Sequence, residues 1–121
     1  MMSIKRSSRV ADLIMADISD ILLREIRDPR IKSVTITGVK LTDDLRLAKV
    51  YYVEMGKDTC DPQLKTALER ATGFLKRELG KRLKLRYIPD IIFMFDESFT
   101  YGSRIDRLLA DLRKTDEPHV E

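Results

Sequence analysis

The sequence predicts a two-layer α+β domain in which helices pack on one face of a three-stranded sheet. Three observations predict this fold class. Apolar residues recur at helical spacing in several stretches, two runs rich in β-branched residues flank a short polar turn, and five apolar residues follow one another from residue 91. The expected order is helix, strand, strand, two helices, strand, helix. With 121 residues, the chain is expected to form one domain with a sizeable core.

The first helix is expected over residues 8–27, with Ser7 or Ser8 as its N-cap. Its apolar stripe follows i, i+3, i+4 and i+7 spacing and consists of Val10, Leu13, Ile14, Ile18, Ile21 and Leu22. Asp28 and Pro29 should end the helix, because proline disfavours helical backbone in the preceding residue. This helix must therefore bury one face against the rest of the chain.

A β-hairpin is expected next, with strands over residues 33–42 and 45–54. In the first strand the apolar alternation changes parity at Gly38, which indicates a β-bulge. The polar residues Thr42, Asp43 and Asp44 should form the turn between the strands.

The central stretch, residues 64–86, organises the prediction because it is apolar on one side and basic on the other. Asp61 is a plausible N-cap for it. Ala71, Thr72 and Gly73 interrupt the pattern, and glycine inside a helix costs about 1 kcal/mol relative to alanine. Two alternatives follow: two helices that meet at a corner, where the small Ala71 and Gly73 permit close approach, or one sharply bent helix.

The apolar run of residues 91–95 is too short for a buried helix and fits a strand covered on both faces. A last amphipathic helix is expected over residues 103–114, and we expect it to shield part of that strand. The core then spans about residues 8–112, and residues 115–121 form a short frayed tail.

Charge is distributed unevenly along the chain although the net charge is only +3. Residues 1–10 carry three basic residues and no acid, residues 73–89 carry six basic residues and one acid, and the remainder carries a net charge of −5. Two separate positive segments are typical of a nucleic-acid-binding face. The alternative is that both runs are solvated helix surfaces.

The basic residues are the candidate phosphate contacts, because ammonium and guanidinium groups suit phosphate oxygens. The first set consists of Lys76, Arg77, Lys81, Arg82, Lys84 and Arg86. A second set consists of Lys5, Arg6, Arg9 and Arg104. Exposed tyrosines among Tyr51, Tyr52, Tyr87 and Tyr101 could stack on bases, although Tyr51 or Tyr52 is expected to pack in the sheet.

Catalytic chemistry finds little support in the sequence. The acidic pairs Asp43–Asp44 and Asp96–Glu97 could hold a metal for a nuclease, but nothing supplies a second positioned base. His119 and Cys60 are the chain's single histidine and cysteine, which excludes a zinc site within one chain and a histidine-based triad. No phosphate-binding glycine loop occurs. We expect no enzymatic activity, metal or cofactor.

The compartment follows from the same inventory. One cysteine indicates a reducing environment, and neither a signal peptide nor a membrane-spanning run is present. We therefore expect a cytoplasmic protein with no membrane partner, and nothing in the sequence indicates an obligate dimer, so we expect a monomer.

Short motifs spread over residues 4–112 carry a family resemblance. The chain resembles ribosome-binding factor A, a bacterial factor for maturation of the small ribosomal subunit. No single piece is specific, but their order and spacing are. The motifs are Arg9, Glu25-Ile26-Arg27-Asp28-Pro29-Arg30, Thr35-Ile36-Thr37-Gly38-Val39, Asp44-Leu45, Ala48-Lys49-Val50-Tyr51, Ala71-Thr72-Gly73, Leu85-Arg86, Pro89 and Phe93 through Asp96.

The resemblance implies a KH-like fold of the second type, α-β-β-α-α-β, here followed by a C-terminal helix. It implies a non-catalytic factor without cofactor that binds 16S ribosomal RNA in the free small subunit. Such factors assist late maturation and processing of the 5′ end of the precursor, above all in the cold.

One feature of the typical KH domain does not carry over to this chain. The Gly-x-x-Gly RNA clamp is replaced by Ala71, Thr72 and Gly73, so the four-nucleotide groove is not expected here. The alternative function is a protein-interaction module that uses the exposed side of the first or last helix and binds RNA incidentally.

Overall fold

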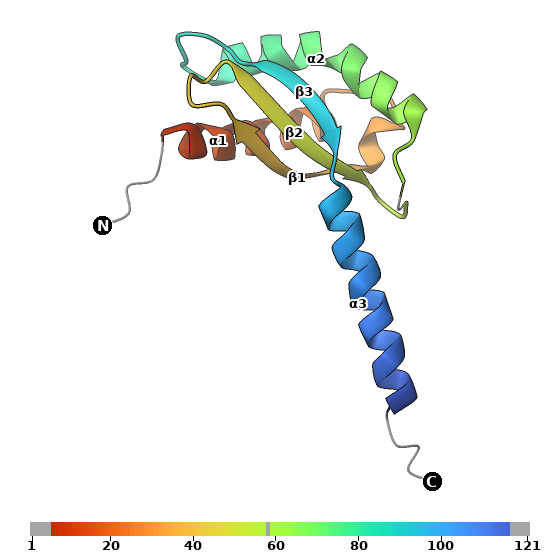
Figure 1. Ribbon diagram of the computed structural model, residues 1–121. Coiled ribbons are helices and arrows are strands. Elements are labelled where there is room, and N and C mark those ends of the chain that lie inside the picture. Colours follow the sequence, from red (N-terminus) through yellow and green to blue (C-terminus); the bar gives the residue numbers. More distant parts are fainter. Residues whose placement is uncertain (1–5, 58, 117–121) are drawn as a thin grey trace, which may run out of the picture.

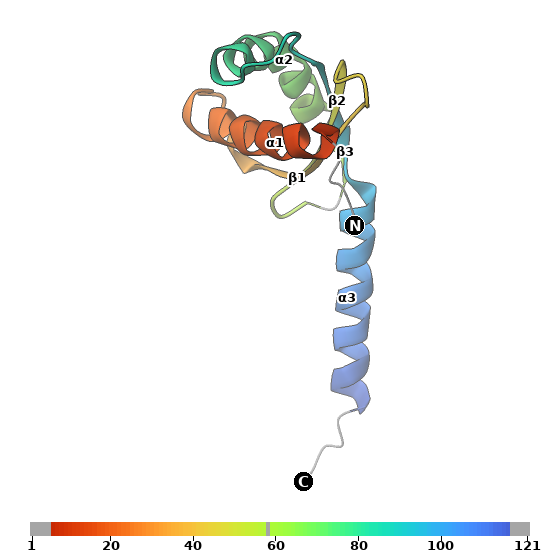
Figure 2. The same cartoon turned by 90° about the vertical axis from the view of Figure 1, so that its left-hand side faces the viewer.

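Two helices cover one face of a three-stranded sheet, and a third helix projects away from that body (Figure 1). The computed structural model describes residues 6–57 and 59–116, without the side chains of residues 99–104 and 113–116. Figure 2 shows α1 and α2 on the same side of the sheet, which confirms the two-layer α+β prediction. The elements are α1 (Arg6–Arg24), η1 (Ile31–Ser33), β1 (Val34–Leu41), β2 (Leu47–Glu54), α2 (Pro62–Arg82), β3 (Asp90–Phe95) and α3 (Glu97–Asp116).

Helix α1 begins and ends earlier than predicted. Ser7 is buried and Ser8 lies within the helix, so the expected cap at either residue is wrong. The predicted stripe is buried except at Leu13, which is 55% exposed. After the helix, the Asp28 carboxylate accepts a hydrogen bond from the Arg30 N–H at 3.0 Å and shapes the loop.

Strands β1 and β2 pair antiparallel, and their register shifts between Ile36 and Gly38, which confirms the predicted bulge. The turn between them begins at Thr42 as predicted. The Asp44 carboxylate accepts hydrogen bonds from the Thr42 hydroxyl at 2.6 Å and from the Arg46 N–H at 3.1 Å. These bonds hold Leu45 in left-handed backbone with φ 63°, a conformation that a leucine rarely adopts.

Helix α2 is one continuous helix, which is the second of the two alternatives, and its axis bends along its length (Figure 1). Asp61 caps it as expected, accepting a hydrogen bond from the Gln63 N–H at 2.9 Å. Gly73 is exposed, and a Cβ there would meet only the Arg77 guanidinium at 3.8 Å, so the expected close approach of two helices at this residue is wrong. Four leucines that face the sheet hold the helix instead: Leu64, Leu68, Leu75 and Leu79.

Strand β3 pairs parallel to β2 and is covered on one face only. Ile91 and Phe93 are buried, whereas Ile92 and Met94 on the opposite face are 46% and 39% exposed. The expectation that α3 shields this face is wrong, because α3 continues from the end of β3 and projects away (Figure 1). It spans Glu97–Asp116 rather than 103–114, so residues 115 and 116 are helical, and residues 117–121 of the expected tail lie outside the description.

The core lies between the helices and the inner face of the sheet, with Tyr52 at its centre. The Tyr52 ring meets Phe93 and Phe95 edge to face at centroid distances of 6.2 and 5.8 Å. Its hydroxyl lies 3.5 Å from the Cys60 sulfur, and burial raises the pKa of Tyr52 far above its ordinary value. Tyr52 is thus the tyrosine that packs in the sheet, as the sequence analysis expected.

Candidate nucleic-acid interface

The basic run of α2 divides into cations that pair with acids and cations that do not. Arg82 makes the largest set of ion pairs. Its guanidinium lies 3.5 Å from Asp17, 2.9 Å from Asp20 and 3.5 Å from Glu25. The Arg82 side chain is only 29% exposed, and the hydrogen bond to Asp20 raises its pKa above the ordinary value. Arg82 therefore connects the C-terminal end of α2 to α1 and to Glu25, the residue that follows α1.

Two lysines of the same run are also paired. Lys76 Nζ lies 2.7 Å from an Asp90 carboxylate oxygen at the start of β3, and Lys81 Nζ lies 3.0 Å from Glu78 one turn earlier in α2. The hydrogen bond from Lys81 holds the pKa of Glu78 below its ordinary value. The Lys76–Asp90 pair is exposed and Lys81 is exposed although Glu78 is half-buried, so both lysines can exchange their partner for another anion.

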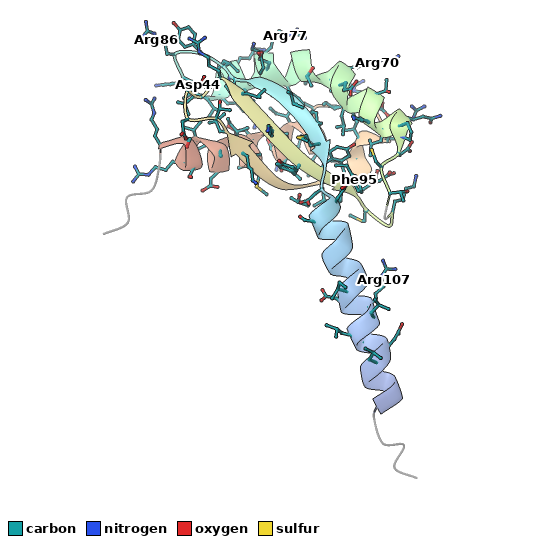
Figure 3. All side chains as sticks on the ribbon, viewed as in Figure 1. Asp44, Arg70, Arg77, Arg86, Phe95 and Arg107 are labelled. Atoms are coloured by element: carbon teal, nitrogen blue, oxygen red, sulfur yellow. The ribbon has the colours of Figure 1, made fainter. Side chains whose placement is uncertain are left out.

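Four exposed cations without such a pair form what we call the free-cation surface: Arg46, Arg77, Lys84 and Arg86. Each is exposed, and none has an acidic partner within 4 Å among the residues that the structure describes. Figure 3 shows Arg77 extending outward from α2 and Arg86 at the adjoining end of the molecule. The four come from three segments: α2, the loop after it, and the hairpin turn. They form a positive surface beside the paired cations.

The loop between α2 and β3 packs against the body, so its backbone is held in a fixed position. Pro89 is fully buried and Ile88 packs against α2, where a Cβ on Gly80 would come within 3.4 Å of it. The missing side chain of Gly80 therefore makes room for Ile88. On the other side, the Asp90 N–H donates to the Arg46 carbonyl at 2.8 Å and joins the loop to the hairpin.

Tyr87 lies in the middle of the free-cation surface and is 59% exposed. Arg46 and Arg86 both lie over its ring, with their guanidinium carbons 5.7 and 5.5 Å from the ring centroid. Tyr51, by contrast, is half-buried with Lys40 5.8 Å from its ring centroid. Tyr87 is thus an exposed aromatic ring among unpaired arginines, which is a composition typical of surfaces that bind single-stranded nucleic acid.

The remaining predicted cations add less. Arg6 and Arg9 are exposed at the start of α1, at the end of the molecule where the hairpin turn lies (Figure 1). Lys5 lies outside the described residues, as do the side chains of Arg104 and Tyr101. The sequence analysis missed Arg46; its signal was its place directly after the turn, where the hairpin pairing brings it to the start of the last strand.

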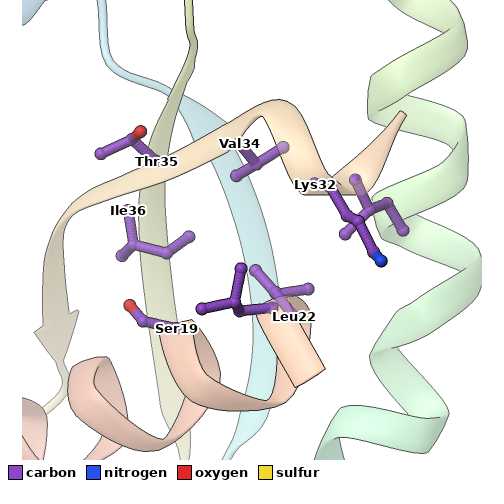
Figure 4. Close-up of a pocket in the computed structure, with 8 residues that line it drawn as sticks. Ser19, Leu22, Lys32, Val34, Thr35 and Ile36 are labelled. Atoms are coloured by element: carbon purple, nitrogen blue, oxygen red, sulfur yellow. The ribbon is translucent and has the colours of Figure 1, made fainter. Parts of the chain in front are cut away.

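The described part of the chain contains pockets and acidic pairs that bear on the nuclease alternative. A pocket of about 210 Å³ lies between the end of α1 and β1 and is largely apolar (Figure 4). A more open pocket of about 440 Å³ lies at the N-terminal end of α2, beside Arg30 and Arg70. No group of three or more metal-ligating side chains gathers among the residues described. The same residues include no helix of the length and apolar character that a bilayer requires.

The two acidic pairs lie far apart. Asp44 lies at the hairpin end of the sheet and Phe95, next to Asp96, at the opposite end (Figure 3). The Asp96 carboxylate accepts hydrogen bonds from the Thr37 and Ser98 hydroxyls. Asp44 is therefore engaged in the hairpin turn and Asp96 in contacts with β1 and the first turn of α3, and they do not converge on one site.

Known proteins are similar to this chain in sequence and in fold. A family model described as Ribosome-binding factor A matches residues 6–109. A curated ribosome-binding factor A from Syntrophus aciditrophicus is 56% identical over 117 residues, which cover 97% of this chain and 95% of that protein.

Two solved structures share the fold. The crystal structure of ribosome-binding factor A from Thermus thermophilus matches with a TM-score of 0.66 and 21% identity over 74% of this chain and 93% of that one. A homology model of the Thermus thermophilus factor, fitted into the cryo-EM map of a 30S complex, matches with a TM-score of 0.63 and 21% identity over 75% of this chain and 96% of that one. Because the family model spans all but the ends of the sequence, the chain belongs to the ribosome-binding factor A family.

Proposed function

We propose that this protein is a non-catalytic assembly factor that binds 16S ribosomal RNA in the free small ribosomal subunit. It assists late maturation of that subunit in the cytoplasm, including processing of the 5′ end of the 16S precursor, and cells need it most in the cold. Family membership supports the general role, and the Thermus relative fitted into the map of a 30S complex supports the choice of subunit.

The observation that carries the proposal is the free-cation surface. Arg46, Lys84 and Arg86 keep their charges available at one end of the molecule, while nearby cations are neutralised by acids. An arginine that lacks a carboxylate partner can offer its whole guanidinium fork to a phosphate. Ribosomal RNA presents a dense row of phosphates, so contact releases counterions and affinity should fall steeply with added salt.

The mechanism that follows is selective binding. A protein that binds one arrangement of RNA helices better than another shifts the RNA toward that arrangement by its difference in affinity. No covalent step is needed, and the body of the protein supplies a rigid platform because α1, α2 and the sheet share one core. Under this mechanism, other enzymes process the 5′ end of the precursor once the RNA has adopted the favoured arrangement.

The decisive experiment reverses two free cations. The variant Arg77→Glu with Lys84→Glu should bind free small subunits at least about tenfold more weakly in sucrose-gradient co-migration, with an unchanged Tm. The matched control is Lys32→Glu with Lys65→Glu, which makes the same charge change at exposed, unpaired lysines elsewhere on the body. Cells that carry only the first variant should accumulate 16S precursor, above all in the cold.

Equal binding by the reversed variant and by wild type would show that RNA is not held through this surface. Assembled ribosomes provide a second comparison. The proposal expects the protein to co-migrate with free small subunits and not with assembled ribosomes.

The rival function, a protein-interaction module, has one observation in its favour. Helix α3 exposes three leucines: Leu108 is 58%, Leu109 48% and Leu112 57% exposed. If this face carries the main function, capture of a protein partner should survive ribonuclease and high salt and should be lost in Leu108→Ser with Leu112→Ser. Binding that disappears with ribonuclease favours the RNA proposal instead.

A further inference from the structure

The aromatic side chain of Tyr87 takes no part in the packing of the core. Tyr87 is 59% exposed, whereas Tyr52 and Phe93 are buried in the core and Tyr51, Phe74 and Phe95 are half-buried. Its neighbours Ile88 and Pro89 are packed against the body, so the backbone that presents the ring is held firmly. A large ring on an anchored loop, with most of its surface in water, is a side chain ready to contact something outside the chain.

The two arginines beside Tyr87 leave room for a ligand. Their guanidinium carbons lie 5.7 and 5.5 Å from the ring centroid, close to the outer limit of about 6 Å for a cation–π contact. Neither Arg46 nor Arg86 has an acid within 4 Å among the described residues, although the charge of Arg46 also acts on the Asp44 carboxylate, so each side chain can turn from the ring to a phosphate. Stacking of a base on an aromatic ring is stronger than an exposed cation–π contact, so a base can displace one arginine from the ring face.

We propose that Tyr87 stacks on an unpaired RNA base while Arg46 and Arg86 bind the phosphates on either side of that nucleotide. This proposal rests on the proposed function and deepens it, since it places a single-stranded nucleotide, not only a duplex backbone, on the surface. Base-paired RNA keeps its bases stacked within the helix, so a ring of this kind selects a bulge, a loop or a strand end.

The test separates stacking from charge. Tyr87→Leu keeps an apolar side chain but removes the aromatic face, and it should bind free small subunits about fivefold to a hundredfold more weakly. The slope of affinity against salt should stay unchanged, because an uncharged side chain releases no counterions. Tyr87→Phe should bind within about twofold of wild type, since stacking needs the ring and not the hydroxyl.

A direct readout is available because the chain contains no tryptophan. Tyr87→Trp places a single indole at the site, and its emission should be quenched when free small subunits are added, after subtraction of the signal with wild-type protein. It should also be quenched by a short oligouridylate at low salt. Unchanged emission at a subunit concentration where gradients show binding would overturn the proposal.

Failure of this proposal is distinct from failure of the proposed function. If Tyr87→Leu binds like wild type while reversal of Arg77 and Lys84 weakens binding, stacking is wrong and the RNA surface stands. If Tyr87→Phe is as weak as Tyr87→Leu, the hydroxyl and not the ring face makes the contact, and stacking is again wrong. If none of these variants weakens binding, the surface itself is wrong.

Discussion

Two arginines of α2, Arg77 and Arg82, carry the same charge and lie five residues apart, yet their surroundings differ. Arg82 is 29% exposed and lies within 3.5 Å of three carboxylates. Arg77 is exposed and has no acidic partner among the described residues. Five residues turn a helix by about 140° beyond a full turn, so the two side chains leave α2 in different directions. One faces the acids of α1, and the other faces away from the body.

The difference shows that a basic run on one helix can serve two purposes. Where the helix faces α1, cations are neutralised and stabilise packing. Where it faces outward, Arg77 keeps its charge for a ligand, whereas Lys76 and Lys81 pair with Asp90 and Glu78. Net charge along the sequence does not distinguish the two, because both kinds of residue count equally toward it. The pairing state of each cation is therefore the better guide to the binding surface.

The largest expected effect concerns Arg77 alone. Arg77→Glu should lower affinity for free small subunits about tenfold and reduce the salt slope by about one unit, because one phosphate contact is replaced by repulsion. Binding measured over a range of salt checks both numbers. Arg70→Glu is the matched control, since Arg70 is exposed, has no ion pair among the described residues and lies two turns before Arg77 on the same helix. Equal losses in the two variants would mean that position on the helix does not matter.

The opposite result is expected for Arg82. Arg82→Gln leaves Asp17, Asp20 and Glu25 without their shared cation, so the Tm should fall by a few degrees, about what a partly exposed ion-pair network gives in a domain of this size. Affinity for small subunits should change by less than about twofold, as measured at a temperature where the variant is folded. A tenfold loss of affinity with no change in Tm would reverse the roles assigned to the two arginines.

Removing the acid that pairs with Lys76 should add a free cation to the surface. Asp90→Asn removes the partner of Lys76, 2.7 Å away, and so frees a cation beside Arg77. Affinity for small subunits should rise about twofold to threefold with a steeper salt slope, while stability changes little because an exposed pair contributes only about 0.2–1 kcal/mol. Asp106→Asn removes the same charge from α3 and should leave affinity unchanged, which a gradient titration of both variants would check.

Much of the fold follows from pattern alone, and the exceptions have physical causes. Alternation and the parity change at Gly38 located the hairpin and its bulge, because a strand with one buried face must alternate. The break expected at Gly73 did not form two helices, since burial of Leu68 and Leu75 on either side outweighs the roughly 1 kcal/mol that a helical glycine costs. At Gly73, tertiary packing therefore outweighs the low helix propensity of the residue.

The site was predictable in position but not in detail. The basic run marked α2 and the loop after it, yet the partner of Arg82 lies 62 residues away at Asp20, a contact that no local pattern reveals. Arg46 belongs to a different segment and reaches Tyr87 only because the hairpin pairs with the last strand. The five apolar residues of β3 likewise look buried on both faces, although Ile92 is 46% exposed.

The smallest expected effect concerns Asp44, the acid of the hairpin turn that lies beside Arg46. Hydrogen bonds from the Thr42 hydroxyl and the Arg46 N–H hold the pKa of Asp44 below its ordinary value of 3.8. The unfolded chain therefore binds this proton more tightly than the folded protein, so the stabilisation is complete at neutral pH and is lost as the pH falls below about 4 through the folded pKa. Wild type should exceed Asp44→Asn in Tm by about one or two degrees at pH 7, because the group is exposed, and by a smaller amount near pH 2.5.

Asp43→Asn is the control, since the Asp43 carboxylate accepts no hydrogen bond within the described residues. It should show no such pH-dependent difference from wild type in thermal melts at both pH values. The physical point is that hydrogen bonds within the turn lower the pKa of Asp44 most and the Arg46 charge adds a smaller contribution, so this acid lies close to Arg46 without an ion pair within 4 Å between them. If Asp44→Asn instead raised affinity for small subunits as much as Asp90→Asn, Asp44 would have to be counted among the pairing acids, and the surface would be less free than its geometry indicates.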